Sequence, residues 1–327
     1  MIELDDIFNV YLNIDHIFAK YAENEEQYKL LSYSLCKTQE ALLNNKQVPC
    51  IQAPLLVYQA IKKRFSKTIY TVTAASTIFY LFLDLMDDVE DNELKNTIWE
   101  EIGQEEAINT ANSFIFLSFL TLNTLRNKYM SNKLKDELWK WGYMLTLGQG
   151  KDIASKRMES YNINDCLKII RQKAGASAEM YCRMGAIAAT EDEELVELYG
   201  KAGRYWGMAI QILGDYVNIW EKGISTDLLN QKKILPIAYA HEHATKEQKR
   251  TLYAALNRAY KDKTTHTVIR QILEKNKTKE YLFKSIKAYK AKAINYLHII
   301  ERKWHINNTE IKVLIDFIRA SDKEMEL

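Results

Sequence analysis

The sequence predicts an all-α protein, and three observations support this fold class. Only three prolines and 11 glycines occur among 327 residues, so the chain has few of the residues that form the turns between strands and in hairpins. Apolar residues recur at helical spacing along most of its length. A hydrophobic fraction of 47% and a charged fraction of 27% suit a globular protein with a sizeable core. We therefore expect a single helical domain over residues 1–327.

The expected helices follow one another closely. Asn162 precedes an apolar run and predicts a capped helix start. Pro49 and Pro54 are expected to isolate residues 46–53 as a turn, because proline disfavours helix at the residue before it. The polar stretch 221–233 is expected to be a loop. The expected helices are 8–23, 26–45, 54–64, 68–91, 104–129, 133–157, 164–189, 193–222, 232–242, 246–260, 265–275, 279–303 and 308–321.

Charge, cysteine usage and hydropathy limit the class of protein. The formal net charge of +2 gives no reason to expect a nucleic-acid partner. The four cysteines lack the pair spacing of a metal site. No basic stretch followed by an apolar core opens the chain, and no run approaches the ~18 consecutive apolar residues of a membrane span. These features favour a cytoplasmic protein with reduced thiols and no transmembrane span.

An acidic cluster lies at residues 82–93, FLDLMDDVEDNE. On a helix, Asp84, Asp87, Asp88 and Asp91 are spaced i, i+3, i+4 and i+7 and share one face. They also fall in its last turns, where the helix dipole disfavours negative charge. A solvated acidic helix end is the simpler explanation, but the residues before the acids are apolar all round, which indicates burial. We therefore expect the mouth of a pocket whose oxygen ligands bind Mg²⁺.

A second, thinner group of polar residues lies downstream. Gln211, Asp215 and Asn218 are spaced i, i+4 and i+7, again on one helix face. Taken singly, each is more readily explained as a surface residue or a satisfied polar group, and only the order of the whole set favours a site. The other members are Gln149, Asp152, Lys173, Asp227, Lys232 and Lys233.

Several motifs, in this order, resemble those of the trans-isoprenyl diphosphate synthases. DDVED (87–91) fits the DDxxD motif of that family, and GQGKDI (148–153) resembles its GQxxD helix. Lys173 resembles the lysine of a Lys-Thr pair, and QILGDYVN (211–218) with the lysine loop after it resembles the second aspartate-rich motif. The similarity covers about residues 50–300. It implies the isoprenoid synthase fold, a single helical bundle around a central prenyl-diphosphate cavity.

The resemblance also implies roles for individual residues. Mg²⁺ and lysines bind an allylic diphosphate, its C–O bond ionises, and a nucleophile captures the cation. Phe82 and Leu83, one turn before the motif, are candidates for capping the prenyl tail, with plain core packing as an even alternative. A homodimer is implied as well. The implied metal ligands are Asp87, Asp88, Asp91, Asp215 and Asn218; the diphosphate-binding residues are Lys173, Lys232, Gln211, Gln149 and Asp152; the catalytic residues are Asp87, Asp88, Asp91 and Lys173.

The chain departs from the chain-elongating members where they bind isopentenyl diphosphate. Their GKxxRP-type segment is matched by NKQVPCIQAPLL (45–56), which keeps Lys46 and Pro54 but has no arginine. The arginine pair that follows DDxxD in those members is replaced by NELKNTIW (92–99), in which Lys95 is the only base. Arginine is hard to replace in bidentate phosphate binding, so the acceptor pocket for isopentenyl diphosphate is expected to be absent.

The remaining features resemble the ComQ group, peptide-tryptophan isoprenyltransferases of competence pheromone biosynthesis. DLMDDVED (84–91) matches the setting of their first motif, and IWEEIGQEEAINTANSF (98–114) resembles a downstream helix with a tryptophan. The second motif, with Gly214, Asp215 and Asn218, fits neither a second DDxxD nor the Asn/Ser/Glu triad of class I terpene cyclases.

The sequence thus predicts a Mg²⁺-dependent prenyltransferase. It is expected to move a geranyl or farnesyl group from an allylic diphosphate to a tryptophan of a small quorum-sensing pheromone precursor peptide. The first alternative is a short-chain prenyl diphosphate synthase or class I terpene synthase of the same fold. The second is a non-catalytic subunit that binds a prenyl diphosphate.

Overall fold

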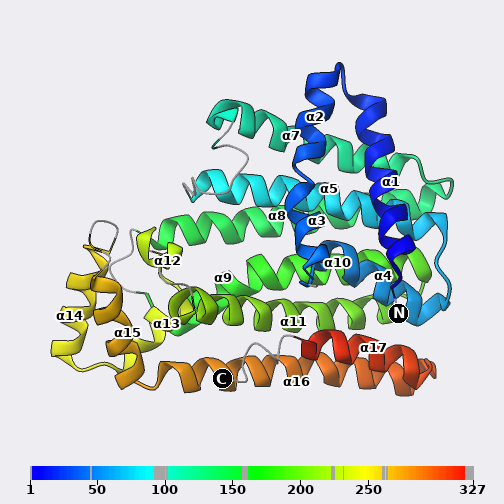
Figure 1. The fold of residues 1–327 in the computed structure, drawn as a ribbon. Helices are drawn as coiled ribbons and strands as arrows, with labels where there is room; N and C mark the ends of the chain where they lie inside the picture. Colours follow the sequence, from blue (N-terminus) through cyan, green and yellow to red (C-terminus); the bar gives the residue numbers. More distant parts are fainter. Residues whose placement is uncertain are drawn as a thin grey trace. The chain divides into compact units, whose positions relative to one another are not determined.

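The protein is all-α throughout the residues that the structure, a computed structural model, describes (Figure 1). These residues are 2–44, 46–91, 100, 102–156, 161–221, 225–230, 232–259, 262 and 264–320. The predicted fold class is therefore confirmed. The chain divides into two compact units: residues 1–142, 178–203 and 296–317 form unit 1, and residues 143–177, 204–295 and 318–327 form unit 2. The expectation of one domain over residues 1–327 stays a prediction.

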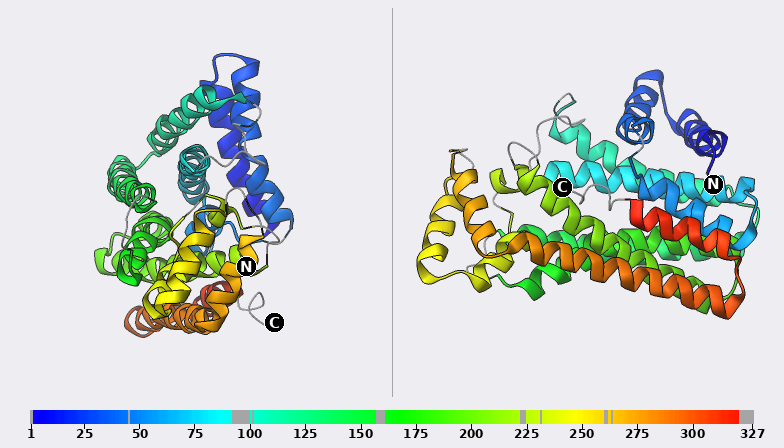
Figure 2. Two further views of the ribbon diagram at one scale, coloured as in Figure 1. Left: turned by 90° about the vertical axis from the view of Figure 1, so that its left-hand side faces the viewer. Right: turned by 60° about the horizontal axis from the view of Figure 1, so that its bottom comes forward.

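Unit 1 is built around one long helix. The helices wholly within it are α1 (Leu4–Tyr21), α2 (Glu25–Tyr33), α3 (Cys36–Leu43), α4 (Pro49–Lys62), α5 (Lys67–Glu90) and α7 (Gln104–Asn123). The helices α8 (Lys128–Ser155), α10 (Ala176–Ala189), α11 (Glu193–Trp220), α16 (Thr278–Trp304) and α17 (Asn308–Arg319) contribute in part. α5 packs against α1, α4 and α7, while α1 and α2 form a hairpin at the start of the chain (Figures 1 and 2).

α5 is the core helix of unit 1. Ile69, Val72 and Ile78 on it are fully buried, and Phe79 is 3% exposed. Among the described residues, α5 is also the one helix whose length and apolar composition would allow it to cross a membrane. However, 61% of its apolar window is buried inside the protein, as in the core helix of a globular unit.

The structure corrects the expected turn at residues 46–53, because α4 already begins at Pro49. Proline suits the first helical position, where its missing N–H needs no partner. Pro54 lies inside the helix and leaves the carbonyl oxygen of Cys50 without its usual amide donor. The hydroxyl of Ser76 donates to that oxygen at 2.7 Å. Proline is tolerated here because a side chain of α5 supplies the missing donor.

Other predicted boundaries were wrong as well. The predicted helix 26–45 is two helices, α2 and α3, separated at Ser34, whose hydroxyl bonds back to the Leu30 carbonyl. The predicted helix 104–129 ends at Asn123, where Thr121 and Thr124 bond back in the same way. The polar loop expected at 221–233 contains the short helix α12 (Thr226–Leu229).

Among its described residues, unit 2 contains the other helices and two apolar cores. Its own elements are α9 (Ile163–Ile170), the π-helical turn η1 (Arg171–Gly175), α12, α13 (Leu235–His243), α14 (Lys246–Leu256) and α15 (Thr265–Lys275). Asn162 caps α9 as predicted, since its side chain accepts from the Asp165 amide at 2.9 Å. One core gathers residues of α9, α11, α13 and α16 around Ile212. The other lies between α13, α14 and α15, the last two packed side by side (Figures 1 and 2).

Candidate active site

The four aspartates of the first motif lie at the C-terminal end of α5, in unit 1. Asp84, Asp87 and Asp88 are helical, and Asp91 is the capping residue, whose amide donates to the Asp87 carbonyl at 2.9 Å. Asp91 is only 3% exposed. The sequence therefore placed these acids correctly: they follow a buried helix and occupy the end at which the dipole opposes negative charge.

Two residues that the sequence did not single out bind the first of these acids. Lys37 of α3 extends its ammonium to the Asp88 carboxylate at 2.7 Å and to the Asp84 carboxylate at 3.3 Å. Tyr80, one turn earlier on α5, donates its hydroxyl to Asp84 at 2.9 Å. Burial lowers the pKa of Lys37, but the two carboxylates outweigh it, and the pKa is raised overall. Burial, followed by the charge of Asp84, raises the pKa of Tyr80, which keeps its proton for this bond.

The donor set of this helix end suits Mg²⁺ by its chemistry. The carboxylates offer oxygen ligands only, the kind that Mg²⁺ prefers. Across the described part of the chain, no group of three or more His, Cys, Asp or Glu side chains is gathered closely enough to hold a metal alone. Mg²⁺ does not require such a cage, because it retains waters and shares its remaining positions with substrate phosphates. Asp87 and Asp91 can therefore hold it with a bound diphosphate.

Phe82 and Leu83, the residues expected to cap the prenyl tail, are both half-buried. The Phe82 ring lies 5.6 Å from the ring of Phe79. Phe79 in turn fills the space above Gly142, where an added Cβ would come within 2.8 Å of it. The ring of Phe82 thus packs against one other aromatic ring of unit 1, and a role in tail length stays a prediction.

In unit 2, Lys173 forms an ion pair with Asp152. Its ammonium lies 2.9 Å from the carboxylate, and the two side chains are 23% and 18% exposed. Lys173 belongs to η1, and such π-helical turns are frequent at functional sites. The pair depends on a close approach of helices: a Cβ at Gly148 of α8 would meet the Gln172 backbone at 2.9 Å.

Gln149, next to Gly148, has a buried carboxamide. Neither its oxygen nor its nitrogen has a hydrogen-bond partner among the described residues. An unsatisfied buried amide costs about 1–3 kcal/mol, which a ligand that bonds to it can recover. This observation singles out Gln149 more strongly than its motif did.

Asp215 of α11 is buried and bonds at both oxygens. The Gln211 amide donates to one at 2.9 Å and the Leu235 backbone amide to the other at 3.4 Å. Burial, aided by the negative charge of Asp227, raises the pKa of Asp215 to about 8. Both causes disfavour the charged form of this carboxyl group.

The lysine loop after α11 is organised around Asn218 and α12. The side-chain oxygen of Asn218 accepts from the Ser225 hydroxyl at 2.5 Å and from the Asp227 amide at 3.4 Å. Lys232 forms an ion pair with Asp227 at 3.7 Å. The Asn218 oxygen, expected to bind metal, thus holds the start of α12.

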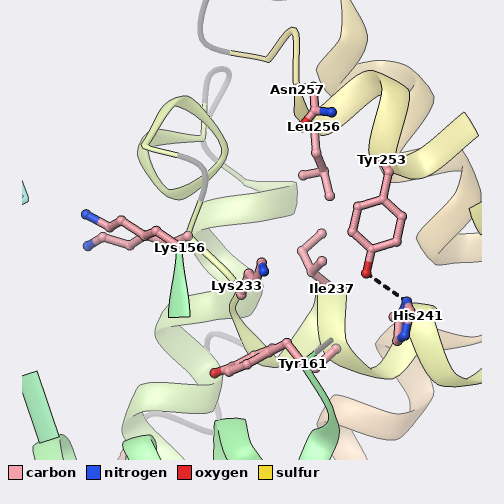
Figure 3. Close-up of a pocket in the computed structure, with 10 residues that line it drawn as sticks. Lys156, Tyr161, Lys233, Ile237, His241, Tyr253, Leu256 and Asn257 are labelled. Atoms are coloured by element: carbon pink, nitrogen blue, oxygen red, sulfur yellow. Dashed lines mark hydrogen bonds between the residues drawn. The ribbon is translucent and has the colours of Figure 1, made fainter. Parts of the chain in front are cut away.

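A small cavity of about 60 Å³ adjoins this loop, as Figure 3 shows. Three lysines line it together with apolar and aromatic residues of α13 and α14. Within it, the Tyr253 hydroxyl and the His241 ring nitrogen Nδ1 are 2.7 Å apart. Burial lowers the pKa of His241, and the nearby Lys249 lowers it further. The lining residues are Lys156, Tyr161, Lys232, Lys233, Ile237, Ala238, His241, Tyr253, Leu256 and Asn257.

The structure thus gathers the predicted residues in two groups. The motif aspartates belong to unit 1, while Lys173, Asp152, Gln211, Asp215 and Lys232 belong to unit 2. Tyr80 could have been found from its i, i+4 spacing to Asp84, whereas Lys37 lies 47 residues away from Asp84 with no pattern to mark it. Lys95 and residues 98, 99 and 101 of the stretch 98–114 lie outside the described residues, as does Lys222, which occupies the last position of the triad in the second motif.

Comparison with known proteins now defines the class. The polyprenyl synthetase family model matches residues 52–275, and the chain belongs to this family. A tryptophan prenyltransferase, ComQ of Bacillus subtilis, is 28% identical over 65% of this chain and 66% of its own length. A (2E,6E)-farnesyl diphosphate synthase of Mycobacterium tuberculosis is 25% identical over 49% of this chain and 46% of its own. The chain therefore spans about half to two thirds of these relatives.

Solved structures support the same fold. A decaprenyl diphosphate synthase from Rhodobacter capsulatus superposes with a TM-score of 0.83 at 15% identity, covering 99% of this chain and 97% of the other. A geranylgeranyl pyrophosphate synthetase from Pyrococcus horikoshii gives 0.78 at 20% identity, covering 94% and 95%. The isoprenoid synthase fold predicted from the sequence is confirmed, in agreement with membership of the polyprenyl synthetase family.

Proposed function

We propose that this protein transfers a geranyl or farnesyl group from an allylic diphosphate to a tryptophan side chain of a small peptide in the cytoplasm, as part of quorum-sensing pheromone maturation. One observation carries the proposal. The first aspartate motif is complete, but the chain has no arginine before Arg64 and none between Arg64 and Arg126. The donor side is retained, while the arginines that would clamp isopentenyl diphosphate are missing. The similarity to a tryptophan prenyltransferase agrees with this pattern.

On the donor side, the proposal assigns roles in metal and diphosphate binding to residues of each group. Asp87, Asp88 and Asp91 are the proposed Mg²⁺ ligands on α5, with Asp215 and Asn218 as further candidates from the second motif. Mg²⁺, when bound, would neutralise the charge that develops on the leaving diphosphate. Lys173 and Lys232 are the proposed sources of positive charge for diphosphate binding. The buried amide of Gln149 would donate a hydrogen bond in an environment from which water is excluded.

On the acceptor side, an indole needs no strong base. Its C3 attacks C1 of the allylic group as the C–O bond breaks, and the electron pair leaves with the diphosphate. The backbone nitrogen of the tryptophan then closes onto C2 and releases its proton to the departed diphosphate or to water. Apolar walls around the reacting carbon would keep water from capturing the cation first.

The test is direct. The protein is incubated with Mg²⁺, geranyl or farnesyl diphosphate and tryptophan-containing peptides, and products are read by mass spectrometry. We expect a mass gain of one prenyl group on the peptide, localised to tryptophan by fragmentation. The Asp87→Ala, Asp91→Ala double variant is expected to fold but to lose this product. Transfer that survives in the double variant would overturn the proposal.

Chain elongation is the alternative that a specific observation favours, because farnesyl and geranylgeranyl diphosphate synthases are also among the relatives. The same incubation with labelled isopentenyl diphosphate in place of peptide separates the two. Labelled products one isoprene unit longer than the donor would establish elongation. Unchanged isopentenyl diphosphate, together with modified peptide, would exclude it.

A further inference from the structure

Helix α16, orange in Figures 1 and 2, has one buried side and one exposed side. The buried side carries residues spaced three or four apart, each at most 4% exposed: Leu282, Ile286, Lys290, Ala293, Leu297 and Ile300. The opposite side carries six exposed residues, four of them in a row spaced i, i+4, i+7 and i+11. We call these six the α16 lysine face: Lys284, Lys287, Ala288, Ala291, Lys292 and Asn295.

The α16 lysine face is basic in a chain whose charges nearly balance. The whole chain has 45 lysines and arginines against 43 aspartates and glutamates, yet residues 281–300 contain lysines and no acid. No described carboxylate forms an ion pair with the three lysines of the face. By contrast, Lys279 and Lys303, at the two ends of α16, pair with glutamates of α15 and α11. The middle of the helix therefore presents positive charge that no acid in the described part of the chain neutralises.

Two tyrosine rings lie at one edge of the face. The rings of Tyr205 on α11 and Tyr289 on α16 stack with their centroids 6.1 Å apart. The ammonium of Lys292 lies 5.4 Å from the centroid of each ring, within the range of a cation–π interaction. Tyrosine, with an apolar ring and a polar hydroxyl, is enriched where proteins meet lipid headgroups. This edge thus combines a positioned ammonium with rings suited to a boundary between water and lipid.

The composition of the face decides what kind of partner it fits. Specific peptide docking depends on large aromatic or arginine side chains and on pockets that receive such anchors. The middle of the α16 lysine face has alanine instead, and none of the exposed large apolar side chains among the described residues belongs to α16. The face also has no arginine, the residue that reads phosphate and base edges with two parallel bonds. Charge without anchors favours a broad anionic surface.

We propose that the α16 lysine face binds the anionic headgroups of a lipid bilayer and holds the protein on the bilayer surface. Lysine stems can lie along the helix while their ammonium groups reach the headgroups, and the attraction falls off within about a Debye length. The inference goes beyond the proposed function and does not depend on it, because headgroup binding requires neither donor nor acceptor. Together, the two would place the enzyme where a prenyl chain partitions.

Binding of the full chain to vesicles tests the proposal without any substrate. Sedimentation is compared for vesicles of phosphatidylcholine alone and for vesicles of equal parts phosphatidylcholine and phosphatidylglycerol. We expect binding to the anionic vesicles alone, and we expect added salt to weaken it because exposed charges are screened. The triple variant Lys284→Gln, Lys287→Gln, Lys292→Gln should lose about 100-fold in vesicle affinity, since each lysine near an anionic surface is worth about fivefold.

A matched triple variant separates the face from the net charge. Lys20→Gln, Lys29→Gln, Lys62→Gln removes three exposed lysines, on α1, α2 and α4, and lowers the net charge by the same amount. It should keep its vesicle affinity within about threefold, because a lysine outside the bound face contributes little once salt screens it. Circular dichroism and thermal unfolding show whether each variant folds.

Several results would overturn the proposal. These are no binding to the anionic vesicles, equal binding to both kinds of vesicle, or equal losses in the two triple variants. A short DNA duplex and a polyglutamate peptide complete the comparison. If either binds through the same three lysines more tightly than the anionic vesicles do, a nucleic acid or an acidic peptide replaces lipid as the partner. Prenyl transfer is measured separately, so none of these results decides the proposed function.

Discussion

Lys173 and Asp152 form an ion pair of 2.9 Å between a π-helical turn and the helix that faces it. The lysine does not follow α-helical spacing, because η1 inserts one extra residue per turn and shifts the direction of its side chain. Both side chains retain partial exposure. A lysine so placed can exchange a carboxylate partner for the oxygens of a diphosphate.

Replacement of Lys173 should therefore weaken donor binding. Lys173→Met is expected to reduce affinity for a non-reactive allylic thiolodiphosphate by about 10–100-fold, the worth of one charge-assisted hydrogen bond. Isothermal titration in the presence of Mg²⁺ measures it. Lys151→Met is the matched control, since Lys151 is exposed on α8 and bonds only to the Gln172 amide oxygen among the described contacts. Equal losses in both variants would contradict a specific role for Lys173.

Glycine at position 148 should be required for the same pair. A Cβ there would lie 2.9 Å from the Gln172 backbone, so Gly148→Ala must push α8 and η1 apart. We expect a loss of about 1–3 kcal/mol in the free energy of unfolding and weaker diphosphate binding. Gly150→Ala has open space around its Cβ and should instead stabilise α8 by about 0.5–1 kcal/mol. Urea unfolding of the two variants measures the contrast, and like signs would refute it.

The buried Asp215 should make stability depend on pH. Its pKa is raised from 3.8 to about 8, so between these values the folded protein holds a proton that the unfolded chain has released. The free energy of unfolding should therefore fall as pH rises through this window, by up to about 1.4 kcal/mol per pH unit, when no divalent metal is present. Asp215→Asn should flatten the curve, whereas Asp316→Asn, at an exposed position of α17, should not. Urea midpoints from pH 5 to 8 test this, and an unchanged slope in Asp215→Asn would rule it out.

Arg183 and Glu137 should carry much of the stability of unit 1. The guanidinium of Arg183 on α10 makes two bonds to Glu137 on α8, at 2.6 and 2.8 Å, and both side chains are under 10% exposed. Burial opposes ionisation of Glu137, but Arg183 outweighs it, and the pKa is lowered. Glu137→Gln removes the buried counterion of Arg183, while the half-exposed Glu197 remains, and should cost about 3 kcal/mol in urea unfolding.

The half-exposed partner of the same arginine provides the comparison for that prediction. Glu197 accepts from the other arm of Arg183 at 2.7 Å, but its side chain is 45% exposed. Glu197→Gln should therefore cost about 1 kcal/mol or less. A larger loss in Glu197→Gln than in Glu137→Gln would show that burial does not decide the energetics of this network.

Much of the fold was predictable because helical periodicity is local. The apolar spacing of α5 and the cap at Asn162 were both read correctly. The start of α4 was missed because proline ends a helix only where its freed carbonyl has no other donor, and here Ser76 provides one from α5. Such a rescue depends on tertiary contact and has no signature in the sequence around Pro54.

The residues of the candidate site were likewise predictable only where the signal was local in the sequence. Asp84, Asp87, Asp88 and Asp91 share a helix face, so their grouping followed from spacing alone. Lys37 could not be inferred, because its bridge to Asp84 and Asp88 joins α3 to α5 across 47 and 51 residues. The π-helical turn at Lys173 was equally hidden, because one extra residue per turn leaves the apolar pattern on both sides intact.

The interrupted hydrogen bond of α4 has an evolutionary consequence. The backbone of Pro54 also lies close to Gly185 of α10. A Cβ added at Gly185 would come within 2.4 Å of the Pro54 carbonyl oxygen. Pro54, Ser76 and Gly185, on three different helices, thus constrain one another through one hydrogen bond and one close contact. We expect substitutions at these positions to be coupled. Homologues without a proline at position 54 should tolerate other residues at positions 76 and 185. Homologues that keep this proline should keep a hydroxyl-bearing residue at position 76 and glycine at position 185.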